Sequence, residues 1–266
     1  MNRREIILSD GTCAQISGAG PALVFLHGVG LNQSIWEAQV KAFAPTYQVI
    51  TFDLLGHGRS ALIAQNATLD DWVLQLESLI QELQLERFSL LGFSFGGMIA
   101  QAFVAKHAGR IEKLVLMSTV YARNEQERAD VLARLDVAQR EGPQAIIGAT
   151  LSRWFSAEFA AKFPEVMQSY ERMLRNNDAV SFLAAYKCFA ADDKQLVGRL
   201  SGFNRPTLVM TGALDRGSTP DMARRLGATI ASASLSIVPL ARHMMPVELP
   251  DEVNSVLRGF LTGEHP

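Results

Sequence analysis

The chain has 266 residues, of which 48% are hydrophobic and 20% charged, the balance of a folded protein rather than a disordered one. Its 25 lysines and arginines against 27 aspartates and glutamates give a formal net charge of −2, without the basic stripe that a nucleic-acid partner requires. The two cysteines, Cys13 and Cys188, lie far apart outside any metal-binding pattern, which favours reduced thiols.

Short β-type runs alternate with helical stretches over residues 1–120. The first two runs, residues 4–9 and 13–17, flank a turn at Asp10-Gly11 and predict a hairpin. Continuous apolar runs, typical of buried parallel strands, follow at residues 22–26, 47–52, 88–91 and 113–117. Helices are expected between them, at residues 32–43, 68–84 and 95–107. This alternation predicts a mostly parallel sheet with helices on both faces.

The alternation stops between residues 121 and 203, where only helical patterns occur. One helix is expected at residues 124–141, ending at Gly142-Pro143, and Ser156 and Asp178 have the character of helix starts. Alternation resumes with strands at 207–211 and 235–238 and helices at 219–226 and 250–261. The sequence therefore predicts an α/β core domain, residues 1–120 and 204–266, interrupted by a helical insertion at 121–203.

A glycine-flanked serine follows the predicted strand at 88–91. The stretch Gly92-Phe93-Ser94-Phe95-Gly96 stands between that strand and a helix, the context of a nucleophile elbow. The two glycines would admit a sharp turn that exposes the Ser94 hydroxyl, so Ser94 is the candidate nucleophile. The competing interpretation is a glycine-rich helix entry capped by a serine.

A serine hydroxyl needs a base to take its proton, and His243 is the candidate. It follows the last predicted strand and precedes the final helix, the place of the base when the order is Ser…Asp…His. The other four histidines are less well placed for this role: His27, His57, His107 and His265. A histidine with a structural role is the alternative.

The acid that orients the histidine is expected to be Asp215. It comes directly after the strand at 207–211, between Ser94 and His243 in the sequence. A turn-forming aspartate is the competing interpretation. Asp53 also ends a strand, but it precedes the nucleophile and is expected to order its loop.

Two backbone amides are candidates for an oxyanion hole. Phe95 immediately follows the nucleophile, and Val29 lies in His27-Gly28-Val29-Gly30, a loop after a strand where glycines let the backbone approach a substrate. The alternative for the second element is a plain tight turn.

These ordered motifs resemble the α/β-hydrolase fold family, and the resemblance covers nearly the whole chain. It implies that the insertion at 121–203 is a helical lid. Within the family the chain is most similar to 3-oxoadipate enol-lactonases, through residues 92–98 with Gln101, 152–156, and 186–191 leading to Arg205-Pro206-Thr207. In those enzymes an Arg-Trp pair from the lid faces the substrate. The resemblance thus makes Arg153 and Trp154 candidates for substrate binding, although a surface arginine beside a core tryptophan fits the sequence too.

The segment around His243 departs from the enol-lactonase pattern. Arg242 stands where a small residue is more usual, and Met244-Met245 replaces Leu-Ser, so these three residues are expected to reshape the pocket. A different small ester, lactone or amide is therefore compatible with the sequence.

The sequence thus points to a cofactor-free, metal-free serine hydrolase of a small ester or lactone, such as an enol-lactone of aromatic catabolism. The alternatives are a C–C bond hydrolase of ring-cleavage products, a perhydrolase with the same triad, and a non-catalytic small-molecule receptor. Dehalogenases and epoxide hydrolases are disfavoured because they use an aspartate at the position of Ser94.

The expected partner is a small-molecule substrate, carboxylated if Arg153 binds it, and not a nucleic acid or a membrane. The apolar run near the N-terminus is too short for a signal peptide, and no run approaches the roughly 18 residues of a membrane span. A cytoplasmic protein is expected, with a homodimer as one option for its assembly.

Overall fold

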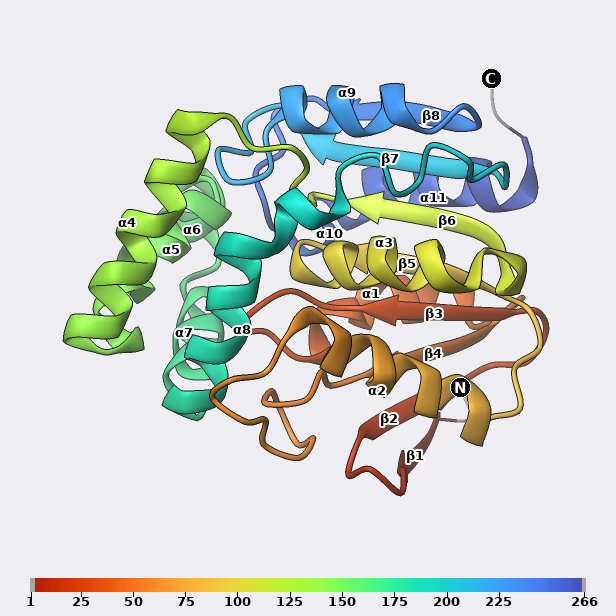
Figure 1. Ribbon diagram of the computed structural model, residues 1–266, viewed down its shortest axis with the longest axis horizontal. Helices are drawn as coiled ribbons and strands as arrows, with labels where there is room; N and C mark the ends of the chain where they lie inside the picture. The colour runs from red at the N-terminus through yellow and green to blue at the C-terminus, as the bar shows by residue number, and fades with distance from the viewer. Residues whose placement is uncertain (1–2, 265–266) are drawn as a thin grey trace.

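A single sheet of eight strands organises the computed structural model, which describes residues 3–264 (Figure 1). The strand order is β1-β2-β4-β3-β5-β6-β7-β8. The strands are β1 (Arg3–Ile7), β2 (Cys13–Ser17), β3 (Ala22–Leu26), β4 (Gln48–Phe52), β5 (Phe88–Phe93), β6 (Ile111–Met117), β7 (Thr207–Gly212) and β8 (Ala233–Val238). The predicted hairpin β1–β2 is antiparallel, as is the pair β2–β4, and the remaining pairs are parallel. The predicted mostly parallel α/β fold is confirmed.

Helices cover both faces of this sheet, because alternate residues of the central strands are apolar on both sides. In β3, Val24 and Leu26 belong to one buried cluster, while Leu23 and Phe25 belong to another. The first cluster is closed by helices α2 (Leu69–Glu82), α3 (Phe95–His107) and α9 (Pro220–Thr229), and the second by α1 (Glu37–Phe43) and α11 (Pro250–Thr262). Figure 1 shows these two sets in front of the sheet and behind it.

The helix expected over residues 32–43 is divided. Its first part, Gln33–Trp36, is a 3₁₀ turn that follows the Asn32 cap, and α1 begins only at Glu37. The N–H of Gln33 donates to Asp53 Oδ1 (2.8 Å), so the tight turn fastens this segment to the loop after β4. Asp53 also accepts from the N–H of Arg59 (2.8 Å) and therefore orders its loop, as expected.

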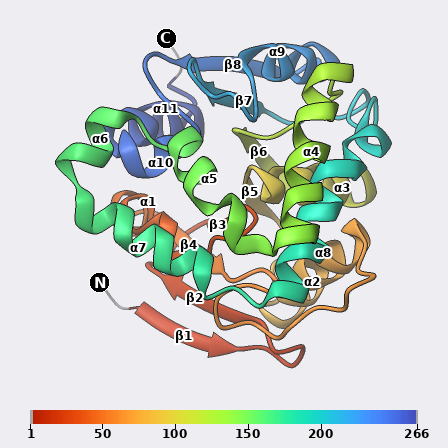
Figure 2. The same cartoon turned by 90° about the vertical axis from the view of Figure 1, so that its left-hand side faces the viewer.

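Five α-helices fill the chain between β6 and β7, and they are called the helical segment here. They are α4 (Glu125–Glu141), α5 (Ile147–Trp154), α6 (Ala157–Lys162), α7 (Pro164–Arg175) and α8 (Ala179–Ala191). Figures 1 and 2 show them beyond the ends at which the parallel strands terminate. Capping side chains mark the starts of α6 and α8 in the sequence, at Ser156 and Asp178. The starts of α5 and α7 have no such mark, because Ile146 and Phe163 precede them.

A buried ion cluster joins the two ends of the helical segment. Asp193, which follows α8, accepts hydrogen bonds from the guanidinium of Arg123 (3.1 Å) and from two nitrogens of Arg128 (3.0 and 3.1 Å). Arg123 precedes α4 and also stacks on the ring of Phe189, 4.7 Å from its centroid. The helical segment is thus fixed at its base by a buried carboxylate that two guanidinium groups share.

Within residues 3–264, no helix has the length and apolar character needed to cross a lipid bilayer.

Candidate active site

Ser94 stands on a sharp turn between β5 and α3. Its φ of 55° and ψ of −115° form a strained backbone conformation for a residue other than glycine. A Cβ on Gly92 would lie 2.4 Å from the carbonyl oxygen of Gly96, and one on Gly96 would lie 2.6 Å from that of His27. Both positions therefore require glycine. The Ser94 N–H donates to Met117 O (2.9 Å), which holds the turn against β6.

The predicted base and acid form a buried hydrogen-bonded pair. His243 Nδ1 lies 2.7 Å from Asp215 Oδ2. The other carboxylate oxygen of Asp215 accepts from the N–H groups of Gly217 (2.8 Å) and Ser218 (2.9 Å). Because a carboxylate only accepts, Nδ1 of His243 must carry the proton, and Nε2 is left with a free lone pair. This is the tautomer that a general base needs.

Aromatic rings fix the plane of the His243 imidazole. Phe93 packs against it with centroids 4.9 Å apart, and Trp154 stacks on it at 6.0 Å and 27°. The N–H of Met244 donates to the carbonyl of Trp154 (3.0 Å), so α5 and the histidine loop are joined by backbone as well. The helical segment therefore helps to orient the base.

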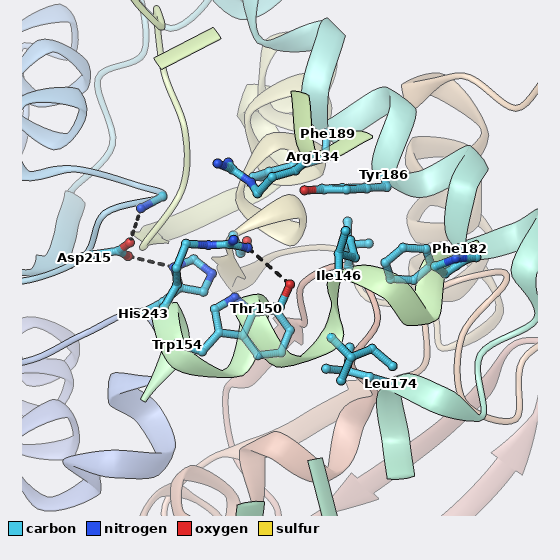
Figure 3. Close-up of a pocket in the computed structure, with 16 residues that line it drawn as sticks. Arg134, Ile146, Thr150, Trp154, Leu174, Phe182, Tyr186, Phe189, Asp215 and His243 are labelled. Atoms are coloured by element: carbon cyan, nitrogen blue, oxygen red, sulfur yellow. Dashed lines mark hydrogen bonds and ion pairs between the residues drawn. The ribbon is translucent and has the colours of Figure 1, made fainter. Parts of the chain in front are cut away.

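The structure brings most of the predicted site residues into one pocket of about 740 Å³, counting the open space at its mouth. Ser94, Asp215, His243, Val29, Arg153 and Trp154 all line it. The remaining lining residues are Arg134, Pro143, Ile146, Ile147, Thr150, Leu174, Phe182, Tyr186, Phe189 and Gly217. Figure 3 shows how the helical segment and the ends of the strands enclose this space.

The two candidate oxyanion donors border the turn at Ser94. Phe95 does not line the pocket with its side chain, which packs against Trp72 at 4.9 Å, but its N–H is the first of α3, where a helix offers no acceptor. The N–H of Val29 has no hydrogen-bond acceptor among residues 3–264. The loop that carries Val29 lies against Ser94, since a Cβ on Gly28 would be 3.0 Å from that of Ser94.

One expectation about the pocket is wrong. Arg242, Met244 and Met245 do not line it. Arg242 points away and donates to the carbonyl of Ser152 (2.8 Å), while both methionines are fully buried in the core cluster behind the sheet. The conformation of the loop around His243 decides which of its side chains face the pocket, and the sequence does not reveal that conformation.

Sequence reasoning missed Arg134, whose guanidinium lines the pocket from α4. A signal was present, because Val131 and Ala138 are buried at positions i−3 and i+4 from it, so Arg134 lies on the inward face of the helix. An arginine on the apolar face of a helix is a candidate for binding an anion. Thr150 also lines the pocket and is marked by no motif, while Tyr186 begins the stretch 186–191 that resembles enol-lactonases but was not predicted as a site residue.

Metal ligands are not gathered anywhere in the described part of the chain: no three His, Cys, Asp or Glu side chains of residues 3–264 could hold a metal ion together. His265, the histidine nearest the C-terminus, lies outside the described residues.

Two further histidines, His27 and His57, are buried with their rings in contact. His27 Nε2 accepts from the N–H of Leu54 (2.9 Å), and its Nδ1 lies 2.8 Å from Gly28 O. Burial lowers the pKa of His27 to about 4. Burial, together with the neighbouring His27, lowers the pKa of His57 to about 3. Both imidazoles are therefore neutral at pH 7.

The protein is expected to lose stability as the pH falls below about 6.5. Below this pH, His27 and His57 bind protons in the unfolded chain. In the folded protein they stay neutral until the pH approaches their lowered pKa values, so acid favours the unfolded chain. Within this pH range, each histidine lowers the free energy of unfolding by about 1.4 kcal/mol for each pH unit. Urea unfolding between about pH 7 and 5 should show a shallower dependence on pH in His57→Gln than in the unsubstituted protein. Identical slopes would contradict this assignment.

The fold and the site define a class of protein. A serine on a strained strand-to-helix turn, with a histidine–aspartate pair at the carboxyl edge of a mostly parallel sheet, is the arrangement of α/β hydrolases. The chain belongs to the alpha/beta hydrolase family, whose family model matches residues 23–256.

Similar proteins agree with this assignment. (E)-2-((N-methylformamido)methylene)succinate hydrolase of Acinetobacter baylyi is 29% identical, covering 92% of this chain and 91% of the relative. The 3-oxoadipate enol-lactonase 1 of the same organism is 25% identical, covering 93% and 91%. The crystal structure of an enol-lactonase from Burkholderia xenovorans superposes with a TM-score of 0.87 at 28% identity, covering 97% of this chain and all of that one. The predicted similarity to enol-lactonases is confirmed.

Proposed function

We propose that the protein is a cofactor-free serine hydrolase that cleaves the acyl bond of a small carboxylated ester or lactone. The observation that carries the proposal is the buried His243–Asp215 hydrogen bond, which leaves Nε2 free in the same pocket as Ser94. A serine becomes a nucleophile when such a base takes its proton.

In the proposed reaction, Ser94 Oγ attacks the acyl carbon and His243 Nε2 accepts the hydroxyl proton. Asp215 stabilises the imidazolium that forms. The oxyanion of the tetrahedral intermediate accepts hydrogen bonds from the N–H groups of Val29 and Phe95. His243 then returns the proton to the leaving oxygen, and a water molecule, activated in the same way, releases the acid from Ser94.

The substrate class rests on the pocket and on the relatives. Arg153 offers a guanidinium to a carboxylate, and the apolar walls suit a small organic acid. The relatives named as enol-lactonases favour an enol-lactone, and the one named as a substituted succinate hydrolase favours a related acyl bond in a dicarboxylic acid. The same triad would serve either bond, because both reactions are acyl transfer to Ser94.

C–C bond hydrolysis of a ring-cleavage product is the second candidate. Such a substrate requires polar groups from the helical segment, and Arg134, Thr150 and Tyr186 are polar residues of that segment in the pocket. A hydrolysis screen of p-nitrophenyl esters, lactones and ring-cleavage products, with Ser94→Ala as control, separates the candidates. Turnover of esters or lactones that Ser94→Ala lacks is expected. Turnover of ring-cleavage products alone would favour the second candidate, and no turnover would favour a non-catalytic receptor.

Arg153→Gln is expected to raise KM for carboxylated esters by about tenfold and to change kcat little, because a charge-assisted hydrogen bond to a remote carboxylate is made equally in the ground and transition states. KM for neutral esters of the same length should change much less. Steady-state kinetics on matched pairs of esters measure the difference, with the surface variant Arg175→Gln as control. Equal changes for both kinds of ester would remove the carboxylate pairing.

A further inference from the structure

Two guanidinium groups face the same pocket without an acidic partner. Arg134 comes from α4 and Arg153 from α5. Neither forms an ion pair with a carboxylate in the part of the chain that the structure describes, residues 3–264. The Nε of Arg134 is buried without a hydrogen-bond acceptor, and the Arg153 guanidinium donates to Thr150 Oγ1 (3.2 Å).

This arrangement differs from that of the ion cluster around Asp193. Arg123 and Arg128, at the base of the helical segment, share the carboxylate of Asp193. Half-buried cations without such a partner are partly desolvated, and a ligand that supplies the opposite charge would offset that cost. The two pocket arginines therefore indicate a ligand rather than a structural role.

The residues that line the pocket include two arginines and one carboxylate, and that carboxylate pairs with neither arginine. Among the described residues that line it, Asp215 is the sole carboxylate, and its oxygens are occupied by His243 and by two backbone N–H groups. Burial, and next the charge of Arg134, hold the pKa of Arg153 below its ordinary value. Each guanidinium is therefore open to a carboxylate of a ligand.

We propose that the pocket selects substrates that carry two carboxylates, one paired with Arg153 and the other with Arg134. This inference rests on the proposed function and narrows its substrate class to dicarboxylic acids. Arg134 is then a specificity-determining residue, while Ser94 and His243 perform the chemistry on a third group of the same substrate.

The two arginines reach the pocket from different helices, so each can offer its guanidinium to a separate group of one ligand. Figure 3 shows Arg134 and Tyr186 above His243, Trp154 below it, and Thr150 beside it at about the same level. Arg153 donates to Thr150 on its own helix, and it lies near enough to Arg134 for the charge of Arg134 to lower its pKa.

Calorimetric titration of the Ser94→Ala protein with succinate, glutarate and adipate tests the proposal without turnover. Each diacid is compared with its monoamide, which has the same shape and one charge fewer. The best diacid should bind at least about tenfold more tightly than its monoamide, the gain expected from one additional charge-assisted pair. In the double variant Ser94→Ala/Arg134→Gln this preference should disappear, while the monoamide keeps its affinity.

The control is Arg140→Gln in the same background, since Arg140 lies on the same helix, is exposed and pairs with Asp136 at the surface. It removes the same charge and should leave the preference unchanged. Arg134→Lys, which keeps the charge, should retain part of the preference. Thermal melts establish that each variant is folded.

Equal affinity of every diacid and its monoamide would overturn the proposal. A loss of monoamide binding in Arg134→Gln would overturn it too, since both arginines would then grip one carboxylate. Inorganic phosphate binding more tightly than any diacid would replace the dicarboxylate by a single dianion. None of these results depends on Ser94, so a failed hydrolysis screen would count against the proposed function and leave this test intact.

Discussion

Ser94→Ala is expected to lower kcat/KM for the substrate of the enzyme by about 10⁴-fold or more, because no other group can take over the nucleophilic attack. The free energy of unfolding should change by less than about 1 kcal/mol. The Ser94 hydroxyl makes no hydrogen bond within residues 3–264, and alanine keeps the Cβ that the turn already accommodates. Steady-state kinetics and urea unfolding of the same preparation measure both effects.

The matched control is Ser152→Ala, which removes an exposed hydroxyl of α5 that does not line the pocket. This variant should keep nearly all activity. If Ser94→Ala retained a large fraction of the activity while Ser152→Ala was normal, the nucleophile would have to be another group.

Asp215→Asn is expected to lower kcat by about 10⁴-fold through the tautomer of His243. An asparagine amide that donates to Nδ1 forces the proton of the imidazole onto Nε2, where it can no longer accept the proton of Ser94. The shape of the side chain is unchanged, so KM should move little and the fold should persist. Kinetics as a function of pH provide a further readout. At neutral pH the activity should stay low, because Nε2 of His243 still carries the proton.

The control for this variant is Asp221→Asn, an exposed carboxylate of α9 paired with Arg224 at the surface. It should leave kcat unchanged. Normal turnover by Asp215→Asn would mean that the aspartate only shapes its turn, the competing interpretation of the sequence. The two hydrogen bonds from Gly217 and Ser218 to Asp215 would then be its main role.

The parts of the site that the sequence predicts are those fixed by local backbone geometry. The turn at Ser94 needs glycine at positions 92 and 96, since any Cβ there would collide with backbone atoms, so the motif is visible in the sequence. Asp215 and His243 are found because each follows a strand, and parallel strands end at one edge of the sheet. The order of Ser94, Asp215 and His243 along the chain, each after a predicted strand, was enough to predict them as site residues.

The parts that escape prediction depend on packing between distant segments. Arg134 reaches the pocket because α4 lies over the carboxyl ends of the strands, a placement that no local pattern encodes. The stacking of Trp154 on His243 joins residues on α5 and on the last loop. The starts of α5 and α7 could not be predicted from the sequence, because their N-cap residues, Ile146 and Phe163, are apolar.

Covalent labelling with a fluorophosphonate, followed by peptide mass mapping, tests the central claim most directly. The reagent phosphonylates a serine only when a base activates it. The account predicts one adduct, on Ser94, that is absent in Ser94→Ala and forms far more slowly in His243→Ala. An unlabelled protein, or an adduct on a different residue that persists in Ser94→Ala, would contradict it.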